Sequence, residues 1–347
     1  MKIQEKYMEQ AVNLHRNYPV VDAHLDLAAE LFCRKMNGEE NPLKEHYLEN
    51  FKKGGFNLIC SSIFLENEQL PEGGLRAALD QISVLLESID QNEEFLLVRT
   101  KQDLDRAIRE DRIGVLMYME GLDCIGNDLK LLRILWELGV RGASLTWSRR
   151  NMFGSGCCKA SQRIQIPGGL SPDGFLAIKE MERLGMFLDI SHLNVDGFED
   201  VCRTAAGPFV ATHSNSQAIF FNYRNLTDEQ IRALGAQGGM MGLNNCDRIV
   251  GCEHEGDPLE MMCQHVEYEV GMLGDDRVGY GFDFCDSFYN AEPKMTPVEY
   301  HMDCLVNHGR VPELTAALLQ RGMPTESVIK IIGGNWVEYF RRMLPER

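Results

Sequence analysis

The residues in this sequence that could bind metal ions or move protons stand at the ends of short apolar runs. Such runs as VVDAHLDL, IGVLMYME and FLDISH have the composition of β-strands. The six residues are His24, Asp26, Glu120, His192, His213 and Asp283. Imidazole nitrogen and carboxylate oxygen suit zinc and also admit manganese, cobalt or iron, so these residue types indicate a metal site for which zinc is the default.

His24 and Asp26 are two positions apart, so on a strand both side chains project from the same face, as a chelating pair requires. A core histidine bonded to a neighbouring acid would give the same short motif. Asp22 shares the parity. We expect it either to accept a hydrogen bond that fixes the imidazole tautomer or to be a residue at the entry of the strand.

Glu120 follows the apolar run IGVLMYM, where an unpaired carboxylate is costly to bury. A metal ion would relieve that cost. Its two oxygens can bridge two cations about 3.5 to 4 Å apart, the arrangement of a binuclear hydrolase. The alternative is a glutamate that caps a turn or forms a salt bridge before Gly121.

His192 in FLDISH and His213 in FVATHS end consecutive β-like runs and complete the candidate ligand set. Asp189 differs from His192 by an odd number of positions and is therefore expected to be structural. With few protein ligands per ion, a bridging water would be deprotonated near neutral pH and act as the nucleophile. Asp283 would then carry the proton to the leaving amine, with Asp286 as its competitor and a structural hydrogen bond as the alternative role.

Alternation of strand-like and helix-like segments predicts the fold that would bring these residues together. Eight β-rich runs span 18–27, 56–65, 113–121, 140–147, 185–192, 208–214, 238–245 and 277–284. Helical periodicity is clearest over 73–90, 128–138, 173–184, 195–205, 228–237 and 258–272. Strand then helix, repeated eight times, predicts a (β/α)₈ TIM barrel, an α/β fold of the metal-dependent hydrolase type. In that fold the C-terminal strand ends meet at one mouth.

No linker or repeat divides the chain, so we expect one barrel domain over residues 1–347, with an N-terminal helix and C-terminal helices that close the barrel. Gly139 and Gly185 are predicted to end helices, and Pro172 to begin one. The closing helices are expected over 296–309, 312–322 and 324–343, the last with a break at Gly333 and Gly334.

Charge and hydropathy exclude several classes of partner. Lys and Arg total 35 against 52 Asp and Glu, a net charge of −17, which disfavours nucleic acid. No apolar run approaches the roughly 20 residues that span a bilayer, and the N-terminus lacks the apolar region of a signal peptide. Eleven cysteines occur without a CxxC pair. We therefore expect a cytoplasmic protein with no membrane partner.

Seven sequence pieces, in order along the chain, resemble the zinc-dependent renal or membrane dipeptidase family and its bacterial relatives. They are DAHLDL, MEG at 119–121, SLTW, LDISH, THS with the later Tyr223-Arg224-Asn225, GFDF and GGN. The resemblance spans nearly the whole chain.

That resemblance implies roles for particular residues. One zinc ion would be held by His24, Asp26 and Glu120, and the other by Glu120, His192 and His213. Asp283 matches the catalytic aspartate, with Glu120 as the bridging residue of the reaction centre. Arg224 matches the arginine that pairs with the substrate's terminal carboxylate, and Tyr223 and Trp147 fall at neighbouring substrate-binding positions.

Trp147 departs from the family pattern, because mammalian members carry a histidine after the Leu-Thr pair. A tryptophan can wall a pocket or donate one N–H, but it cannot carry a proton charge. Arg149 or Arg150 is a candidate to replace the lost contact; the alternative is that both are solvated loop charges.

The function expected from these features is a zinc-dependent dipeptidase that cleaves dipeptides, including those with a C-terminal D-residue, by attack of a hydroxide bound to two metal ions. One alternative keeps the metals but hydrolyses an N-acyl amino acid, a lactam or a lactone. A second, from another class, is a barrel that binds metal or a small ligand without turnover. The resemblance also makes a homodimer an assembly to expect.

Overall fold

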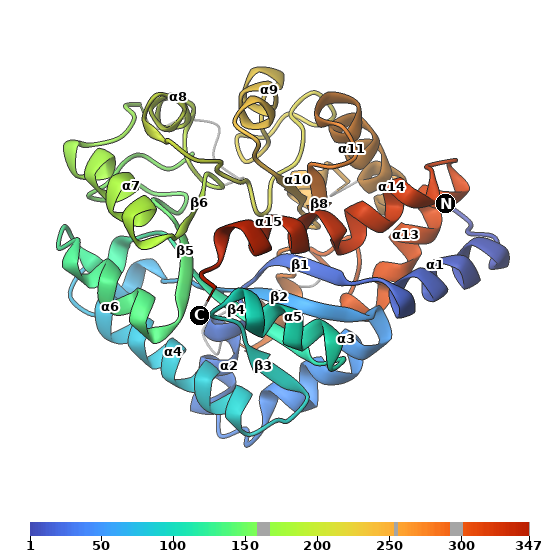
Figure 1. Cartoon of the computed structure of the whole chain (residues 1–347), viewed down its shortest axis with the longest axis horizontal. Helices are drawn as coiled ribbons and strands as arrows, with labels where there is room; N and C mark the ends of the chain where they lie inside the picture. The colour runs from blue at the N-terminus through green and yellow to red at the C-terminus, as the bar shows by residue number, and fades with distance from the viewer. Residues whose placement is uncertain (158–166, 253–255, 292–300, 347) are drawn as a thin grey trace.

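Parallel strands form the centre of the molecule and helices surround them (Figure 1). The computed structural model describes residues 1–157, 167–252, 256–291 and 301–346. Hydrogen bonding gives the strand order β1-β2-β4-β5-β6, and every pair in it is parallel. The strands are β1 (Val20–Leu25), β2 (Phe56–Ile63), β4 (Ile113–Glu120), β5 (Val140–Ser144) and β6 (Phe187–Asp189).

The second half of the barrel is less regular than the first. Its strands are β7 (Met241–Leu243) and β8 (Val278–Tyr280), which pair in parallel. The predicted strand 208–214 is reduced to two isolated bridges, Asp189 with Val210 and Ala211 with Met241. The N–H of Thr212 donates to the Asp189 carboxylate at 3.0 Å instead of to a strand carbonyl, which interrupts the ladder. Seven of the eight predicted runs contain a strand, and the barrel fold is confirmed.

Asp22 closes the barrel between β8 and β1. Its Oδ1 accepts the N–H of Phe282 at 2.8 Å and that of His24 at 3.2 Å, while Oδ2 lies 2.8 Å from Nε2 of His308. The Asp283 N–H also donates to the His24 carbonyl at 3.1 Å. Asp22 therefore binds the backbone of His24 and not its ring, and it fixes the two strands that carry His24 and Asp283.

The strand β3 (Phe95–Leu97) was not predicted from the sequence. It pairs with the first residues of β4, from Ile113 to Val115, while β5 pairs with β4 only from Met117 onward. The short run FLL thus pairs with the first residues of β4, which β5 leaves without a partner on that side.

The helices that follow the strands agree with the predicted ranges to within two residues. They are α4 (Gly74–Asp90), α6 (Lys130–Leu138), α7 (Pro172–Leu184), α8 (Val195–Thr204), α9 (Asp228–Ala236) and α11 (Pro258–Leu273). Gly139 and Gly185 end α6 and α7 in the left-handed conformation, with φ of 113° and 72°. Ser171 caps α7 directly before Pro172. The predicted helix ends at Gly139 and Gly185 and the predicted helix start at Pro172 are therefore present, and each has a common type of cap.

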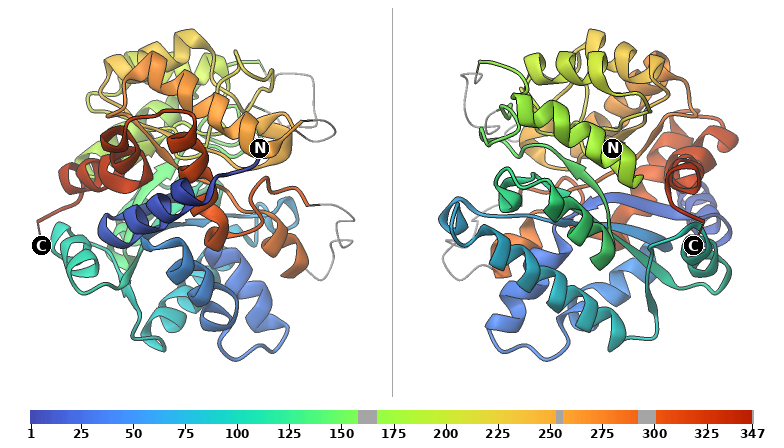
Figure 2. Two further views of the ribbon diagram at one scale, coloured as in Figure 1. Left: turned by 90° about the vertical axis from the view of Figure 1, so that its right-hand side faces the viewer. Right: turned by 60° about the vertical axis from the view of Figure 1, so that its left-hand side comes forward.

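The remaining helices have at most ten residues, except α1, which has 13. They are α1 (Glu5–Asn17), α2 (Leu27–Met36), α3 (Glu49–Gly54), α5 (Lys101–Arg109), α10 (Asp247–Val250), α12 (Asp286–Ala291), α13 (Val311–Gln320), α14 (Thr325–Ile329) and α15 (Asn335–Met343). Figure 2 shows α1 beside the C-terminal helices, where His15 bonds to Gly54 O at 2.6 Å and to Thr315 Oγ1 at 2.8 Å. Across the described ranges, no helix has both the length and the apolar character needed to cross a bilayer.

The helix predicted over 296–309 is wrong for residues 301–307. This segment is irregular, with bends at 304–307 and one antiparallel bridge that places Asp303 opposite Cys246 in the loop after β7. The Asp303 carboxylate accepts the N–H groups of Cys285 and Asp286, so the acid caps α12. Residues 296–300 lie outside the described residues. At 324–343 the predicted break is present as a π-helical turn, Lys330–Gly334, between α14 and α15.

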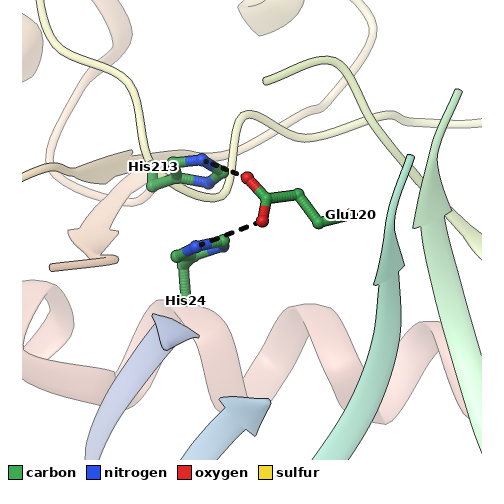
Figure 3. A group of neighbouring side chains, drawn as sticks. All are labelled: His24, Glu120 and His213. Atoms are coloured by element: carbon green, nitrogen blue, oxygen red, sulfur yellow. Dashed lines mark ion pairs between the residues drawn. The ribbon is translucent and has the colours of Figure 1, made fainter. Parts of the chain in front are cut away.

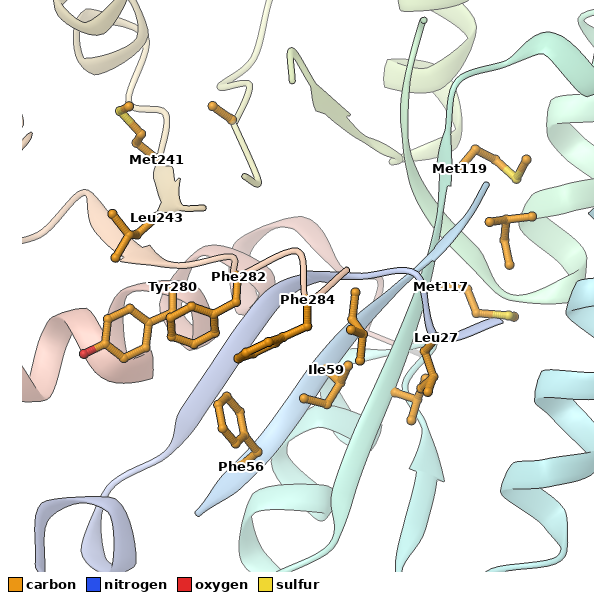
Figure 4. Close-up of a cluster of buried hydrophobic side chains, with 14 of the residues drawn as sticks. Leu27, Phe56, Ile59, Met117, Met119, Met241, Leu243, Tyr280, Phe282 and Phe284 are labelled. Atoms are coloured by element: carbon orange, nitrogen blue, oxygen red, sulfur yellow. The ribbon is translucent and has the colours of Figure 1, made fainter. Parts of the chain in front are cut away.

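The helix α15 covers the barrel at the end away from the strand C-termini and crosses the middle of Figure 1. Trp336 packs over Gly242 and Gly279; a Cβ on Gly279 would lie 2.3 Å from Nε1 of the indole. On the other side of the strands, aromatic residues of β8 and its extension lie near Phe56 (Figure 4). Burying each large aromatic contributes about 1.5 to 3 kcal/mol, so this packing holds the strand ends in place.

Glu269 on α11 is fully buried, and neither of its carboxylate oxygens has a hydrogen-bond partner among the described residues. Burial raises its pKa well above the ordinary value. The folded protein therefore holds Glu269 protonated at pH values where the unfolded chain ionises it. The free energy of unfolding is therefore unaffected by this group below the pKa that Glu269 has in the unfolded chain. Above that pKa it falls by about 1.4 kcal/mol for each pH unit, until the pH reaches the pKa of the folded state.

We expect Glu269→Met to raise the unfolding temperature at pH 8 by more than it does at pH 4.5, because the substitution removes this pH-dependent loss. Differential scanning calorimetry across that pH range measures the effect. Glu326→Gln, at an exposed acid on α14, is the control and should shift neither value. A Glu269→Met gain that does not depend on pH would contradict the argument.

Candidate metal centre

The carboxylate of Glu120 faces two stacked imidazoles at the C-terminal mouth of the barrel (Figure 3). Its Oε2 is 4.0 Å from His24 Nε2, and its Oε1 is 3.5 Å from His213 Nε2. The three side chains are at most 3% exposed and come from β1, β4 and the 208–214 segment. The two oxygens of one carboxylate therefore face different partners, as a bridging ligand requires.

His192 joins this group from the loop after β6. Its Nε2 lies 2.8 Å from Glu120 Oε1 and 2.9 Å from His213 Nε2. A tetrahedral ion with bonds of 2.0 to 2.1 Å would place its ligand atoms about 3.3 Å apart, close to these separations.

On the other side of Glu120, two acids lie near His24. Nε2 of His24 is 3.3 Å from Asp283 Oδ1 and 3.8 Å from Asp26 Oδ1. The Ser62 hydroxyl donates to the same oxygen of Asp26. The sequence predicted that all six residues would meet at one mouth, and the structure places them together.

The backbone is irregular at three places where these side chains turn into the mouth. His192 and Asp283 adopt left-handed conformations, with φ of 67° and 59°, which cost non-glycine residues about 1 to 2 kcal/mol each. In β1 the pairing with β2 shifts by one residue between Asp22 and Leu25, and this irregularity precedes the turn of His24 and Asp26 into the site. Such local strain is common where a side chain must be aimed.

The residues present fit divalent metal ions. Two groups of three have ligand atoms within 4.8 Å of one another: His24 with Glu120 and His213, and His24 with Asp26 and Asp283. His24 Nε2 and Glu120 Oε2 are buried and make no hydrogen bond to any residue that the structure describes. Buried polar atoms without partners are rare, and a cation would satisfy both.

Electrostatics of the metal-free site points the same way. Burial alone would lower the pKa of His24, but the carboxylates of Glu120, Asp283 and Asp26 outweigh it and raise the pKa to about 10. Burial, with Asp26 nearby, raises the pKa of Glu120 well above its usual range. The pKa of His192 is lowered well below its ordinary value by burial and by the charge of Arg224. In the absence of metal ions these shifts favour a protonated, positively charged His24 and a neutral His192.

A cavity of about 240 Å³ opens onto these residues and is lined by Asp26, Glu120, His192 and Asp283. Part of its wall is formed by aromatic side chains. They are Phe64, Trp147, Phe288 and Tyr289. Pockets for drug-sized ligands usually exceed about 300 Å³, so this one suits a small substrate.

Arg224 brings a positive charge to the same cavity. Its Nη2 donates to His213 O at 3.0 Å and its Nη1 to Ser214 Oγ at 3.4 Å, while the residue is only 4% exposed. Within the described ranges its guanidinium forms no salt bridge with a carboxylate of the protein. A buried guanidinium held by neutral acceptors is suited to an anionic group of a ligand.

The other predicted substrate-binding residues are placed differently from one another. Trp147 lines the cavity, with its ring 5.1 Å from that of Phe64. Tyr223 instead lines a smaller neighbouring cavity that shares His192 and Arg224.

Neither arginine that follows Trp147 lines the main cavity. Arg149 pairs with Asp123 at 3.0 Å and lies 5.2 Å over the Trp147 ring. Arg150 donates to Ser155 Oγ at 2.6 Å. They hold the loop around Trp147, and within the part of the chain that the structure describes neither forms a hydrogen bond or ion pair with the six clustered residues.

Sequence reasoning missed a set of polar residues that hold the clustered side chains. They are Tyr118, Ser148, Thr212 and Asn244, which bond to His24, His192, His213 and Asp283 respectively. The available signal was weak: each is a single polar residue within or beside an apolar run.

A parallel barrel that gathers imidazoles and carboxylates at the C-terminal ends of its strands is the architecture of metal-dependent hydrolases. Residues 8–344 match the model of the membrane dipeptidases, peptidase family M19, and the chain belongs to this family. The resemblance noted in the sequence is confirmed, and the protein is a dipeptidase of a metallopeptidase family.

Individual relatives agree with this assignment. Dipeptidase verJ of Clonostachys rogersoniana is 27% identical over 354 residues, which cover 96% of this chain and 87% of that protein. The crystal structure of the dipeptidase AC, an M19 metallopeptidase, is 28% identical with a TM-score of 0.82, covering 94% of this chain and 99% of that one. A Rhodobacter sphaeroides metallopeptidase liganded with a phosphinate mimic of L-Ala-D-Ala is also 28% identical, with a TM-score of 0.80 and the same coverage.

We expect Glu120→Gln to unfold near the wild-type temperature in a chelator, because an amide has nearly the shape of the protonated carboxyl that burial favours. With excess zinc, wild type should gain stability, about 4 kcal/mol at a thousandfold excess over Kd, and the variant should lose most of that gain. Thermal unfolding with and without zinc measures both. Glu137→Gln on the surface of α6 is the control. An equal zinc gain in both variants would exclude Glu120 as a ligand.

Proposed function

We propose that this dipeptidase cleaves its substrate with two divalent metal ions, zinc by default, bridged by Glu120. His24 and Asp26 would complete one site, and His192 and His213 the other. Each of the two Glu120 oxygens faces a different histidine, which supports this division. When bound, the ions would lower the pKa of a shared water and polarise the scissile carbonyl.

The observation that carries the choice of substrate is the buried guanidinium of Arg224 on the cavity wall. A dipeptide places its terminal carboxylate one residue beyond the scissile amide, so a fixed cation near the metal centre selects that length. A longer peptide would replace the carboxylate with a neutral amide, which cannot form an ion pair with the guanidinium.

Asp283 is proposed to move the proton. Asn244 holds its Oδ2 at 3.0 Å, while Oδ1 faces His24 in the cavity. Burial would raise the pKa of Asp283, but the charges of His24 and Arg224 and the bond from Asn244 lower it. The group is therefore ionised and able to accept the proton of the attacking water, then donate it to the leaving amine.

A C-terminal D-residue is proposed to be acceptable. The Rhodobacter sphaeroides structure, with its L-Ala-D-Ala mimic, supports this extension. Arg224 recognises the carboxylate and places no requirement of its own on the configuration of the adjoining carbon.

N-acyl amino acids are a second candidate substrate class. They carry the same terminal carboxylate, and the aromatic wall formed by Phe64, Trp147 and Phe288 would accommodate an apolar acyl group. Comparing free and N-acylated forms of one dipeptide series distinguishes the two classes.

We expect L,L- and L,D-dipeptides to be hydrolysed and their C-terminal amides to react about 100-fold more slowly or worse. Arg224→Gln should lower kcat/KM for the free dipeptide by a similar factor and leave the slow amide nearly unchanged, because the lost contact is the same in both cases. Arg224→Lys should recover part of the loss. Equal losses on the acid and the amide would refute carboxylate recognition.

For Asp283→Asn we expect kcat to fall by about 10² to 10⁴, the usual contribution of a positioned acid or base, with metal content and KM close to wild type. Steady-state kinetics together with metal analysis of the same preparation tests this. Full activity in the variant would assign the proton transfer to another group.

A further inference from the structure

The Nδ1 atoms of His213 and His24 point away from the centre and are connected through two hydroxyls. His213 Nδ1 lies 2.7 Å from Thr212 Oγ1, and His24 Nδ1 bonds to the Tyr118 hydroxyl. That hydroxyl is 3.3 Å from Thr212 Oγ1. Thr212 Oγ1 in turn lies 2.6 Å from Oδ2 of Asp189, which is buried.

Counting hydrogens gives this network a direction. A carboxylate only accepts, and Asp189 Oδ1 already accepts the N–H groups of Ser191 at 2.9 Å and Thr212 at 3.0 Å. Its Oδ2 therefore takes the one hydrogen of the Thr212 hydroxyl. Thr212 Oγ1 then has only lone pairs left for His213, so the hydrogen between them belongs to His213 Nδ1. The lone pair of His213 Nε2 is left facing Glu120.

The same hydroxyl extends the direction to His24. Because Thr212 Oγ1 has no hydrogen left to give, the contact with Tyr118 requires the phenol to donate. The phenol oxygen then accepts from His24 Nδ1, and His24 Nε2 is left facing the centre. His192 lies outside this network, since its Nδ1 bonds to Ser148 Oγ at 2.7 Å.

We propose that Asp189 is a positioning residue that sets the ring tautomer of His213 through Thr212, with Tyr118 extending the same control to His24. Asp189 is 1% exposed and does not line the cavity that opens onto the centre. The inference rests on the proposed metal-binding role of these histidines. Outer partners of this kind typically contribute 10-fold to 100-fold in metal affinity.

Asp189→Asn is the sharpest variant, because the surrounding donors dictate how the amide must sit. The two backbone N–H groups require the amide oxygen at the Oδ1 position, so the NH₂ group faces Thr212. The Thr212 hydroxyl then accepts from the amide and turns its own hydrogen toward His213 Nδ1. His213 should move its hydrogen to Nε2, where it blocks metal binding.

The direct measurement is a long-range ¹H–¹⁵N spectrum of the histidine rings in metal-free protein. We expect the Nδ1–H tautomer of His213 in wild type and the Nε2–H tautomer in Asp189→Asn. Zinc titration followed by metal analysis should show one of two zinc equivalents weakened about 10-fold to 100-fold. Circular dichroism establishes that the fold is retained.

Variants at position 212 test the relay without touching the backbone bonds of Asp189. Thr212→Ser keeps the hydroxyl and should behave as wild type, whereas Thr212→Val removes it and should weaken zinc binding.

Ser148→Ala is the control, because Ser148 bonds to His192 and lies outside the network. This variant should alter the His192 signal and leave the His213 tautomer unchanged. An unchanged His213 tautomer in Asp189→Asn, or equal zinc affinities in Thr212→Ser and Thr212→Val, would overturn the proposal.

The two proposals fail separately. Loss of the tautomer shift leaves the hydrolysis experiments standing, because those depend on Arg224 and Asp283. A protein that binds zinc and shows the shift but cleaves no dipeptide would overturn the proposed substrate and support the role of Asp189.

Discussion

Three carboxylates and three imidazoles share one buried volume at the mouth of the barrel, and the protein alone does not satisfy them. Glu120 is the centre of this constraint, because each of its two oxygens faces a different histidine and it is 3% exposed. Burying a carboxylate without a compensating charge costs several kcal/mol. A cation is the simplest remedy, and the positions of the surrounding side chains follow from that requirement.

The barrel supplies the positions by bonding the site to its own closure. Asp22 joins the backbones of His24 and Phe282, so the same carboxylate that closes β8 against β1 also sets the distance between His24 and Asp283. Asp189 has the parallel role between β6 and the 208–214 segment. In both places the carboxylate of a buried aspartate accepts a backbone N–H that would otherwise bond to a carbonyl of the neighbouring strand. A residue of the metal centre follows the bonded backbone directly: Asp283 after Phe282, and His213 after Thr212.

The outline of the fold and the clustering of the site residues could be predicted from the sequence, because strand ends are marked by periodicity and barrel strands share one mouth. The 208–214 run could not be distinguished from a regular strand, since the partner of the Thr212 N–H is a side chain 23 positions away. Residues 301–307 have helical periodicity but bond to a loop that only the tertiary structure brings near. Tyr118 and Thr212 look like ordinary strand residues, because a hydroxyl's role depends on which donors and acceptors surround it.

The left-handed conformations of His192 and Asp283 have a consequence for sequence change in this fold. Glycine or asparagine would adopt either backbone conformation at lower cost, so at these two positions selection for stability and selection for chemistry favour different residues. If a related protein no longer needed catalytic activity, selection would not act against replacement of these two residues by glycine or asparagine. Such replacements would mark the change from enzyme to inert scaffold while the barrel itself remained intact.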